Sequence, residues 1–230
     1  TWATVSGYRT GENPARWAGN LKEVLPPPSK LARVNHFAAL PWQDVPAFLI
    51  DLKQRDGAGA RALEFIVYTA ARSAEVRLAT YDEFDLKAKL WTIPAERMKA
   101  GKAHRVPLSP PAVALLKALP RFEDSPYVFT APRGGALSDM SINSVCRRMK
   151  VAAVPHGFRS SFKDWARTST NYPDEVSELA LAHVNSDATR AAYARDELLA
   201  QRARLMTEWG KFLTVPARKG SVTPIRRGSR

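Results

Sequence analysis

Four side chains of the kinds that cleave phosphodiesters lie close together in the chain. His156 and Arg159 belong to a His-Gly-Phe-Arg segment. His183 follows in Leu-Ala-His, and Tyr193 stands ten residues beyond it. A phenol can attack phosphorus, arginine can neutralise phosphate oxygens, and imidazoles can move protons or donate hydrogen bonds. The types and order of these residues indicate attack on a phosphodiester without a metal.

The spacing of His156 and Arg159 favours an anion site. His-x-x-Arg places both polar groups on one face of the first turn of an expected helix. The N-terminus of a helix adds partial positive charge at the same place. A lone histidine more often makes a structural hydrogen bond, and Tyr193 could equally be a core tyrosine with an exposed hydroxyl.

Basic residues elsewhere could complete such a site. Arg72 falls between two expected helices, with Glu75 in the following turn. Its side chain could point out of the core, or it could cover a helix end or pair with Glu75. Lys99 and Lys102 fall on the tip of an expected hairpin, where a long side chain can reach a neighbouring groove. The alternative for either lysine is a phosphate contact or a solvated turn.

The chain as a whole is strongly basic. Its 230 residues include 35 Lys and Arg against 22 Asp and Glu, a formal net charge of +13. This balance suits a polyanion such as nucleic acid, although a solvated basic surface is the alternative. A cluster at the end of one expected helix could lie along DNA or complement the helix dipole. It consists of Arg147, Arg148 and Lys150.

Composition argues against several other classes of protein. The single cysteine, Cys146, cannot form an internal disulfide, which fits a reducing cytosol. It is expected in the core or half-buried, without a chemical role. The four histidines have no acidic cluster at ligand spacing, so no metal is expected. No apolar run approaches the length of about 20 residues that spans a bilayer, and the first residues do not form a secretion signal.

Hydrophobic patterning predicts a mainly helical α+β fold around one small sheet. Helices are expected over about 41–55, 60–71, 110–119, 138–150, 156–170, 175–181 and 197–213. Tyr193 is expected on a further helix that Asp187 can cap. β-rich runs predict a three-stranded antiparallel sheet made of Phe84–Leu86, Leu90–Ile93 and Arg105–Leu108. The last helix, with Trp209 and Phe212, could pack on its own core or on a neighbouring protomer.

Three parts of the chain are expected to differ in character. Residues 1–40 contain scattered glycines and three consecutive prolines, which is typical of a linker to a preceding module. Residues 41–213 carry the helical and strand patterns and form the expected catalytic domain. Residues 214–230 are polar and basic and are expected to be disordered.

Taken in order, Arg72, Lys99, His156 with Arg159, His183 and Tyr193 resemble the catalytic domain of the tyrosine recombinases. The resemblance is closest to prophage and genomic-island integrases and covers about residues 41–213. Its strongest parts are His156–Phe162 and the pair formed by His183 and Tyr193. The sequence departs from the family at Ala70-Ala71, where glycine is frequent before the arginine. Residues 1–40 resemble the end of a preceding core-binding region.

The resemblance implies how the bond would be broken. Tyr193 attacks the scissile phosphate, forms a 3′-phosphotyrosine and releases a 5′-hydroxyl. Arg72 and Arg159 hold the non-bridging oxygens of the transition state, and His183 adds a hydrogen bond to them.

It also implies how the protons move. His156 accepts the phenolic proton, and Lys99 protonates the leaving 5′-oxygen. Lys102 takes that place if the register of the hairpin differs, and otherwise contacts DNA. Glu75 supports neighbouring groups.

The implied activity is site-specific recombination that integrates or excises a mobile element without metal, ATP or other cofactor. The implied partners are double-stranded attachment sites, further protomers in a tetramer on DNA, and DNA-bending accessory proteins. A bacterial cytoplasm, in association with the nucleoid, is the implied location, with no membrane partner. Three alternatives stay open: a type IB topoisomerase-like enzyme, a DNA-binding protein without catalysis, and a metal-dependent nuclease.

Overall fold

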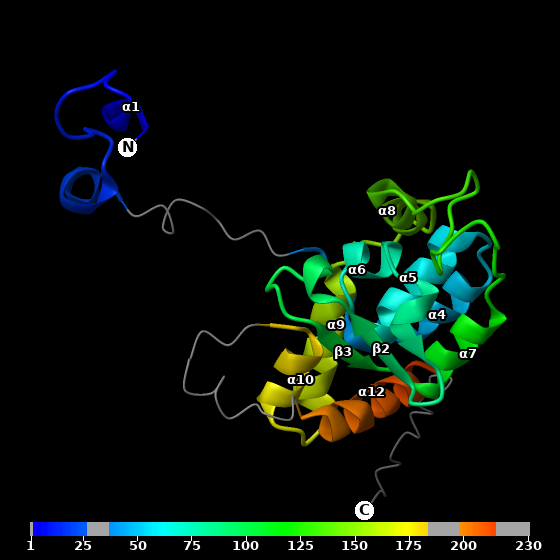
Figure 1. Ribbon diagram of the computed structural model, residues 1–230. Helices are drawn as coiled ribbons and strands as arrows, with labels where there is room; N and C mark the ends of the chain where they lie inside the picture. Colours follow the sequence, from blue (N-terminus) through cyan, green and yellow to red (C-terminus); the bar gives the residue numbers. More distant parts are fainter. Residues whose placement is uncertain (1, 27–36, 184–197, 215–230) are drawn as a thin grey trace, which may run out of the picture. The chain divides into compact units, whose positions relative to one another are not determined.

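The chain divides into two compact units, Thr1–His36 and Phe37–Arg230 (Figure 1). A computed structural model describes residues 2–26, 37–183 and 198–214. The smaller unit contains α1 (Trp2–Val5), a distorted turn over Trp17–Leu21, and α2 (Lys22–Val24). None of its described residues is buried. The assignment of residues 1–40 as a linker and 214–230 as a tail stays a prediction, and residues 215–230 lie outside the described part.

Two helices at the start of the larger unit form the centre of the core. α4 (Val45–Lys53) follows a short turn over Trp42–Asp44, and α5 (Ala58–Thr69) is buried along most of its length. Arg61 joins them by donating to the carbonyls of Leu52 (3.0 Å) and Arg55 (2.8 Å). Carbonyls at the end of a helix lack partners within it, so this arginine satisfies them and fixes α4 against α5.

A short antiparallel sheet packs on α5. Trp91 and Ile93 are buried whereas Thr92 between them is exposed, the alternation of a strand with one face on the core. The ring of Phe65 on α5 lies 5.4 Å from that of Trp91, centroid to centroid. The strands follow the order β1 (Phe84–Asp85), β2 (Leu90–Ile93) and β3 (His104–Pro107).

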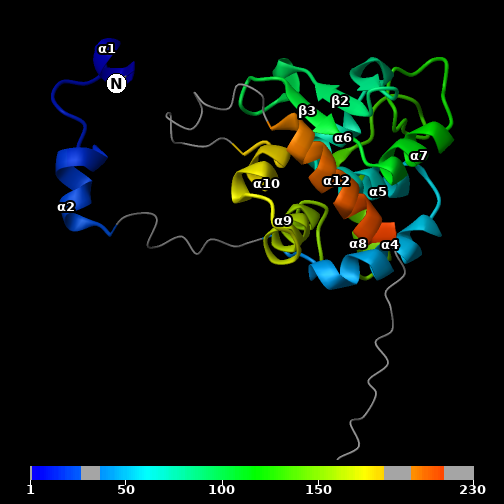
Figure 2. The same cartoon turned by 90° about the horizontal axis from the view of Figure 1, so that it is seen from below.

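The remaining helices close the core around α5. α12 (Leu199–Thr214) lies against α4, α5, β3, α7 (Pro110–Ala118) and α10 (Asp174–Ala180) (Figure 2). Trp209 of α12 is fully buried, donates its indole N–H to the carbonyl of Val67 (2.8 Å), and lies 4.9 Å from the ring of Trp165. The last helix therefore packs on its own core. The other described helices of this unit are α6 (Ser73–Arg77), α8 (Asp139–Arg148) and α9 (Gly157–Ser169).

The predicted mainly helical α+β fold with one three-stranded antiparallel sheet is confirmed. α8 ends at Arg148, two residues before the predicted end, and Lys150 follows with a left-handed φ of 53°. Tyr193 and its expected helix lie outside the described residues. In the part of the chain that the structure describes, no helix has the length and hydrophobicity to cross a bilayer.

Truncation of Trp209 tests whether α12 belongs to the core of this unit. We expect Trp209→Ala to lower the free energy of unfolding by about 3–5 kcal/mol, because it opens a large cavity and leaves a carbonyl without its donor. Urea denaturation followed by circular dichroism measures this loss. Phe122→Ala, at a side chain that is 52% exposed, is the matched control. A loss below about 1 kcal/mol for Trp209→Ala would show that α12 adds little to the core.

Candidate active site

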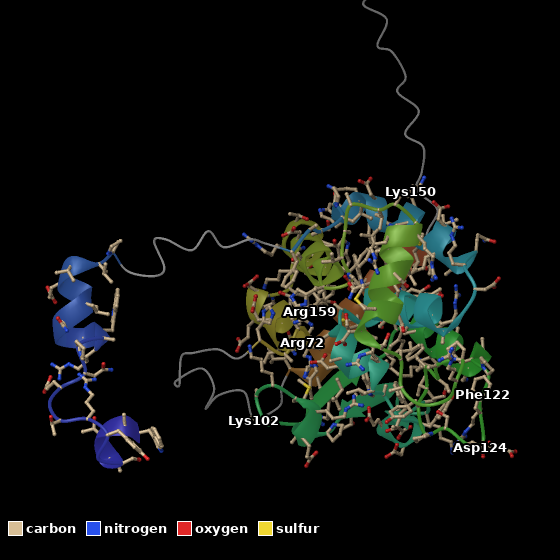
Figure 3. All side chains as sticks on the ribbon, turned by 90° about the horizontal axis from the view of Figure 1, so that it is seen from above. Arg72, Lys102, Phe122, Asp124, Lys150 and Arg159 are labelled. Atoms are coloured by element: carbon tan, nitrogen blue, oxygen red, sulfur yellow. The ribbon has the colours of Figure 1, made fainter. Side chains whose placement is uncertain are left out.

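Two arginines lie side by side where the ends of four helices meet (Figure 3). Arg159, in the first turn of α9, donates to the carbonyls of Ala70 (2.6 Å) and Leu181 (2.7 Å), which end α5 and α10. Arg72, at the start of α6, donates to the carbonyl of Ala182 (3.2 Å) and more weakly to that of Leu181 (3.5 Å). Carbonyls of one chain turn after α10 therefore orient both guanidinium groups.

Arg159 is a buried cation. Its side chain is 4% exposed, and burial, together with the charge of Arg72, lowers its pKa to about 10. It still carries its charge at neutral pH. The negative charges of Glu75 and Glu178 oppose this lowering of the pKa. Among the described residues, neither carboxylate forms a hydrogen bond with the guanidinium of Arg159. A buried positive charge balanced mainly by neutral carbonyls favours an incoming anion.

Glu75 holds Arg72 at two points. One carboxylate oxygen accepts from the guanidinium of Arg72 (2.7 Å), and the other accepts from its backbone N–H (2.8 Å). Glu75 is buried, whereas Arg72 is partly exposed. The guanidinium is thereby fixed at its base while its outer edge still reaches the surface.

His183 connects Arg159 to an acidic residue of α10. The guanidinium of Arg159 lies 3.2 Å from Nε2 of His183, and Nδ1 lies 2.7 Å from a carboxylate oxygen of Glu178. Because a guanidinium can only donate, Nε2 accepts, and the imidazole proton sits on Nδ1. The other carboxylate oxygen of Glu178 pairs with Lys163 (2.5 Å). Burial by itself raises the pKa of Glu178, but hydrogen bonds from Lys163 and His183 outweigh this effect and lower the pKa below its ordinary value.

The sequence patterns do not identify Glu178 or Lys163 as site residues. Glu178 precedes His183 by five residues, a spacing that does not by itself bring two side chains together on a helix. The contact forms because the chain turns back after α10, where His183 N–H donates to the carbonyl of Glu178 (3.0 Å). Lys163 follows Arg159 by four residues and so lies on the same face of α9. This spacing is the feature of the sequence that could have identified Lys163 as part of the site.

His156 immediately precedes α9 and lies beside the arginines. Burial lowers its pKa, as do the positive charges of Arg159 and Arg72, while Glu75 opposes the shift. The imidazole is therefore neutral at physiological pH and can accept a proton. The ring of Phe37 covers it, with the two ring centroids 4.4 Å apart.

The other predicted basic residues are exposed. Lys99 and Lys102 lie on the connection between β2 and β3, and the basic cluster lies at the end of α8. In the view of Figure 3, Lys102 and Lys150 lie on opposite sides of the two arginines. The cluster consists of Arg147, Arg148 and Lys150. Tyr193 lies outside the described residues, so the structure gives no position for the predicted nucleophile.

Nothing in the described part of the chain resembles a metal centre. No group of three His, Cys, Asp or Glu side chains within it is arranged to hold a metal ion. Cys146 is buried in α8, and burial raises the pKa of its thiol to about 11, so it remains a neutral thiol at physiological pH.

Two alanines next to the arginines have left-handed backbone. Ala70 has a φ of 52° and Ala182 a φ of 50°. Their carbonyls are acceptors for Arg159 and Arg72, respectively. This conformation suits glycine because a β-carbon crowds the following carbonyl.

The sequence model of the phage integrase family matches residues 33–198. The chain belongs to the phage integrase family. Prophage integrase IntA of Escherichia coli K12 is 35% identical over a compared length of 159 residues, and the match covers 67% of this chain and 38% of that protein. The integrase of Enterobacteria phage P4 is 31% identical over a compared length of 209 residues, and the match covers 81% of this chain and 48% of that protein. This family member thus spans less than half the length of these two relatives.

Solved structures show the same fold. The integrase of mycobacterium phage Brujita superposes with a TM-score of 0.59 at 17% identity, over 92% of this chain and 71% of that one. The lambda integrase dimer bound to a COC′ core site gives 0.51 at 16% identity, over 72% of this chain and 62% of that one. The tyrosine recombinase catalytic fold expected from the sequence is therefore confirmed.

Replacement of Ala182 by glycine tests the left-handed turn that carries His183. Left-handed backbone at an alanine costs about 1–2 kcal/mol, and glycine removes this cost. Glycine also loses more conformational entropy on folding, which offsets part of the gain. We therefore expect Ala182→Gly to raise the free energy of unfolding by about 0.5–1 kcal/mol. Ala180→Gly, within α10, is the matched control and should lower it by about as much. Urea denaturation compares the two. Equal destabilisation by both changes would contradict the assigned backbone.

Proposed function

We propose that this integrase family member is a site-specific DNA recombinase that integrates or excises a mobile element such as a prophage. Tyr193 is the proposed nucleophile, and a 3′-phosphotyrosine is the proposed intermediate. The observation that supports this most strongly is the convergence of Arg72, Arg159 and His183 around a shared turn. Two fixed guanidinium groups beside an imidazole suit a phosphate that gains negative charge in its transition state.

The proposed reaction is an in-line transfer of the phosphoryl group. The phenolic oxygen of Tyr193 forms a bond to phosphorus as the bond to the 5′-oxygen breaks. Neutral His156 takes the phenolic proton, and Lys99 supplies a proton to the leaving oxygen. Lys102, on the same hairpin, is the alternative acid. Rejoining reverses these steps on a partner strand, so the energy of the bond is kept and no ATP is consumed.

Arg72 and Arg159 would stabilise the transition state by exchanging partners. In the structure these arginines donate to the carbonyls of Ala70, Leu181 and Ala182. A guanidinium carries five N–H groups, so phosphate oxygens can be bound without breaking every one of these contacts. Glu75 would keep Arg72 in place during the exchange.

His183 would need a second proton to donate to the phosphate. In the described arrangement Nε2 accepts from Arg159 and the proton sits on Nδ1. Protonation of Nε2 gives an imidazolium, which the carboxylate of Glu178 stabilises through Nδ1. Lys163 holds that carboxylate in position. Glu178 and Lys163 are thus proposed positioning residues.

Double-stranded attachment sites are the proposed substrate. The basic cluster Arg147, Arg148 and Lys150, together with Lys102, would contact phosphates, and binding would weaken steeply with salt. The lambda integrase structure is of a dimer bound to a COC′ core site. By family membership we propose that this chain also acts with further protomers, as a tetramer on DNA, aided by DNA-bending accessory proteins. The proposed location is the nucleoid of a bacterial host.

Capture of a covalent adduct tests the proposed reaction. The substrate is a pool of nicked DNA duplexes with randomised core sequences. We expect the wild-type chain to form a covalent adduct with some of them. The adduct accumulates because the short strand with the released 5′-hydroxyl dissociates, which prevents rejoining. Denaturing gels and sequencing of the adducts read out the reaction, with EDTA present to exclude metal-dependent cleavage. Tyr193→Phe should give no adduct. DNA binding without any wild-type adduct would favour a non-catalytic binding protein.

Substitution of Glu178 tests its proposed support of His183. We expect Glu178→Gln to slow adduct formation about 10-fold, the effect of one charge-assisted hydrogen bond of about 1.5 kcal/mol. Glu175→Gln removes the same charge from the same helix and should change the rate less than twofold, about the effect of an ordinary surface change. Single-turnover kinetics at saturating DNA measure both. Equal rates for the two variants would remove Glu178 from the mechanism.

A further inference from the structure

The first residues of the larger unit lie across the start of α9. Phe37–Leu40, here called the strap, bonds to this region at two points. The backbone N–H of Val154 donates to the carbonyl of Ala38 (3.0 Å), and the hydroxyl of Ser161 donates to the carbonyl of Leu40. The strap is therefore fixed on both sides of the His-Gly-Phe-Arg segment.

Gly157 makes this close approach possible. A β-carbon at residue 157 would lie 2.0 Å from the carbonyl oxygen of Ala38 and 2.8 Å from the α-carbon of Ala39. Both atoms belong to backbone, which cannot move aside as the end of a flexible side chain can. Only glycine fits between His156 and the rest of α9 while the strap keeps its place.

The strap places an aromatic ring on His156. The centroids of the Phe37 and His156 rings lie 4.4 Å apart, with an angle of 53° between their planes. Phe37 is 60% exposed, so burial in the core does not account for its position. The charged and titratable groups near enough to His156 to change its pKa are Arg159, Arg72, His183 and Glu75. Phe37 adds an aromatic ring that contacts the imidazole itself.

We propose that Phe37 is a positioning residue that holds the imidazole of His156 in the orientation in which it accepts the proton of the nucleophile. This inference rests on the proposed function. An imidazole turns freely about its χ2 angle unless neighbours restrict it, and a tilted ring contact at this distance does so. The strap also shields the imidazole from water on one side, which keeps it neutral and ready to act as a base.

Loss of the ring should therefore have a pH-dependent effect. Without Phe37 the imidazole is more hydrated, so its pKa rises towards the ordinary value. The base is then protonated over more of the acidic range. Adduct formation should fall more at about pH 6 than at about pH 8, a difference that a general loss of stability would not produce.

Histidine NMR and adduct kinetics together test the proposal on the full chain. His156→Gln identifies the His156 resonance among the four histidines. We expect Phe37→Leu to remove the ring-current shift of that resonance, raise its titration midpoint and slow adduct formation by about threefold to tenfold, the range of an aromatic contact. Phe37→Tyr should restore all three. Phe122→Leu, at another exposed phenylalanine far from the arginines in Figure 3, should change none of them.

The outcomes separate this inference from the proposed function. An unchanged His156 resonance in Phe37→Leu, or equal losses of rate at both pH values, would overturn the positioning role. The proposed function would still be supported if the wild-type chain formed the adduct. A wild-type chain that forms no adduct, with the ring-current shift present, would overturn the proposed function and with it the role of Phe37. Rescue by Phe37→Tyr together with the pH-dependent loss would support the inference.

Discussion

The larger unit depends on the burial of one cation at the meeting point of three helices. Arg159 projects from the start of α9, and its guanidinium satisfies carbonyls at the ends of α5 and α10. Terminal carbonyls have no partner within their own helices, and a buried guanidinium is costly unless it is hydrogen-bonded. The guanidinium of Arg159 and the carbonyls of Ala70 and Leu181 therefore satisfy one another, which fixes α5, α9 and α10 in one arrangement. The same arrangement brings Arg72 and His183 beside Arg159.

This solution leaves charge available for function. Neutral carbonyls satisfy the hydrogen bonds of Arg159 without cancelling its charge, and Arg72 adds a second positive charge nearby. Left-handed backbone at Ala70 and Ala182 turns their carbonyls toward the arginines, so some local strain accompanies the arrangement. Glu75 and Glu178 then hold Arg72 and His183 from behind. A phosphate bound in front of these groups would meet donors that are already oriented.

The sequence predicted what depends on local pattern. Alternation of apolar and polar residues identified β2, and helical periodicity identified α5 and α12. The three-residue spacing of Arg72 and Glu75 allowed an ion pair between them, and the structure contains this pair. It did not predict contacts between distant residues. The partner of His156 is Phe37, more than a hundred positions earlier, and nothing in a linker-like segment marks it. The choice between a core and a neighbouring protomer for α12 also required packing, since Trp209 suits either surface.

The most direct measurement is an experimental structure of Tyr193→Phe bound to a cleavable DNA site. The convergence of the two arginines predicts that the scissile phosphate lies within hydrogen-bond distance of the guanidinium groups of Arg72 and Arg159 and of Nε2 of His183. It also predicts that residue 193, from the same or a neighbouring protomer, faces the phosphorus opposite the 5′-oxygen. A scissile phosphate bound elsewhere, with neither arginine in contact with it, would contradict the account.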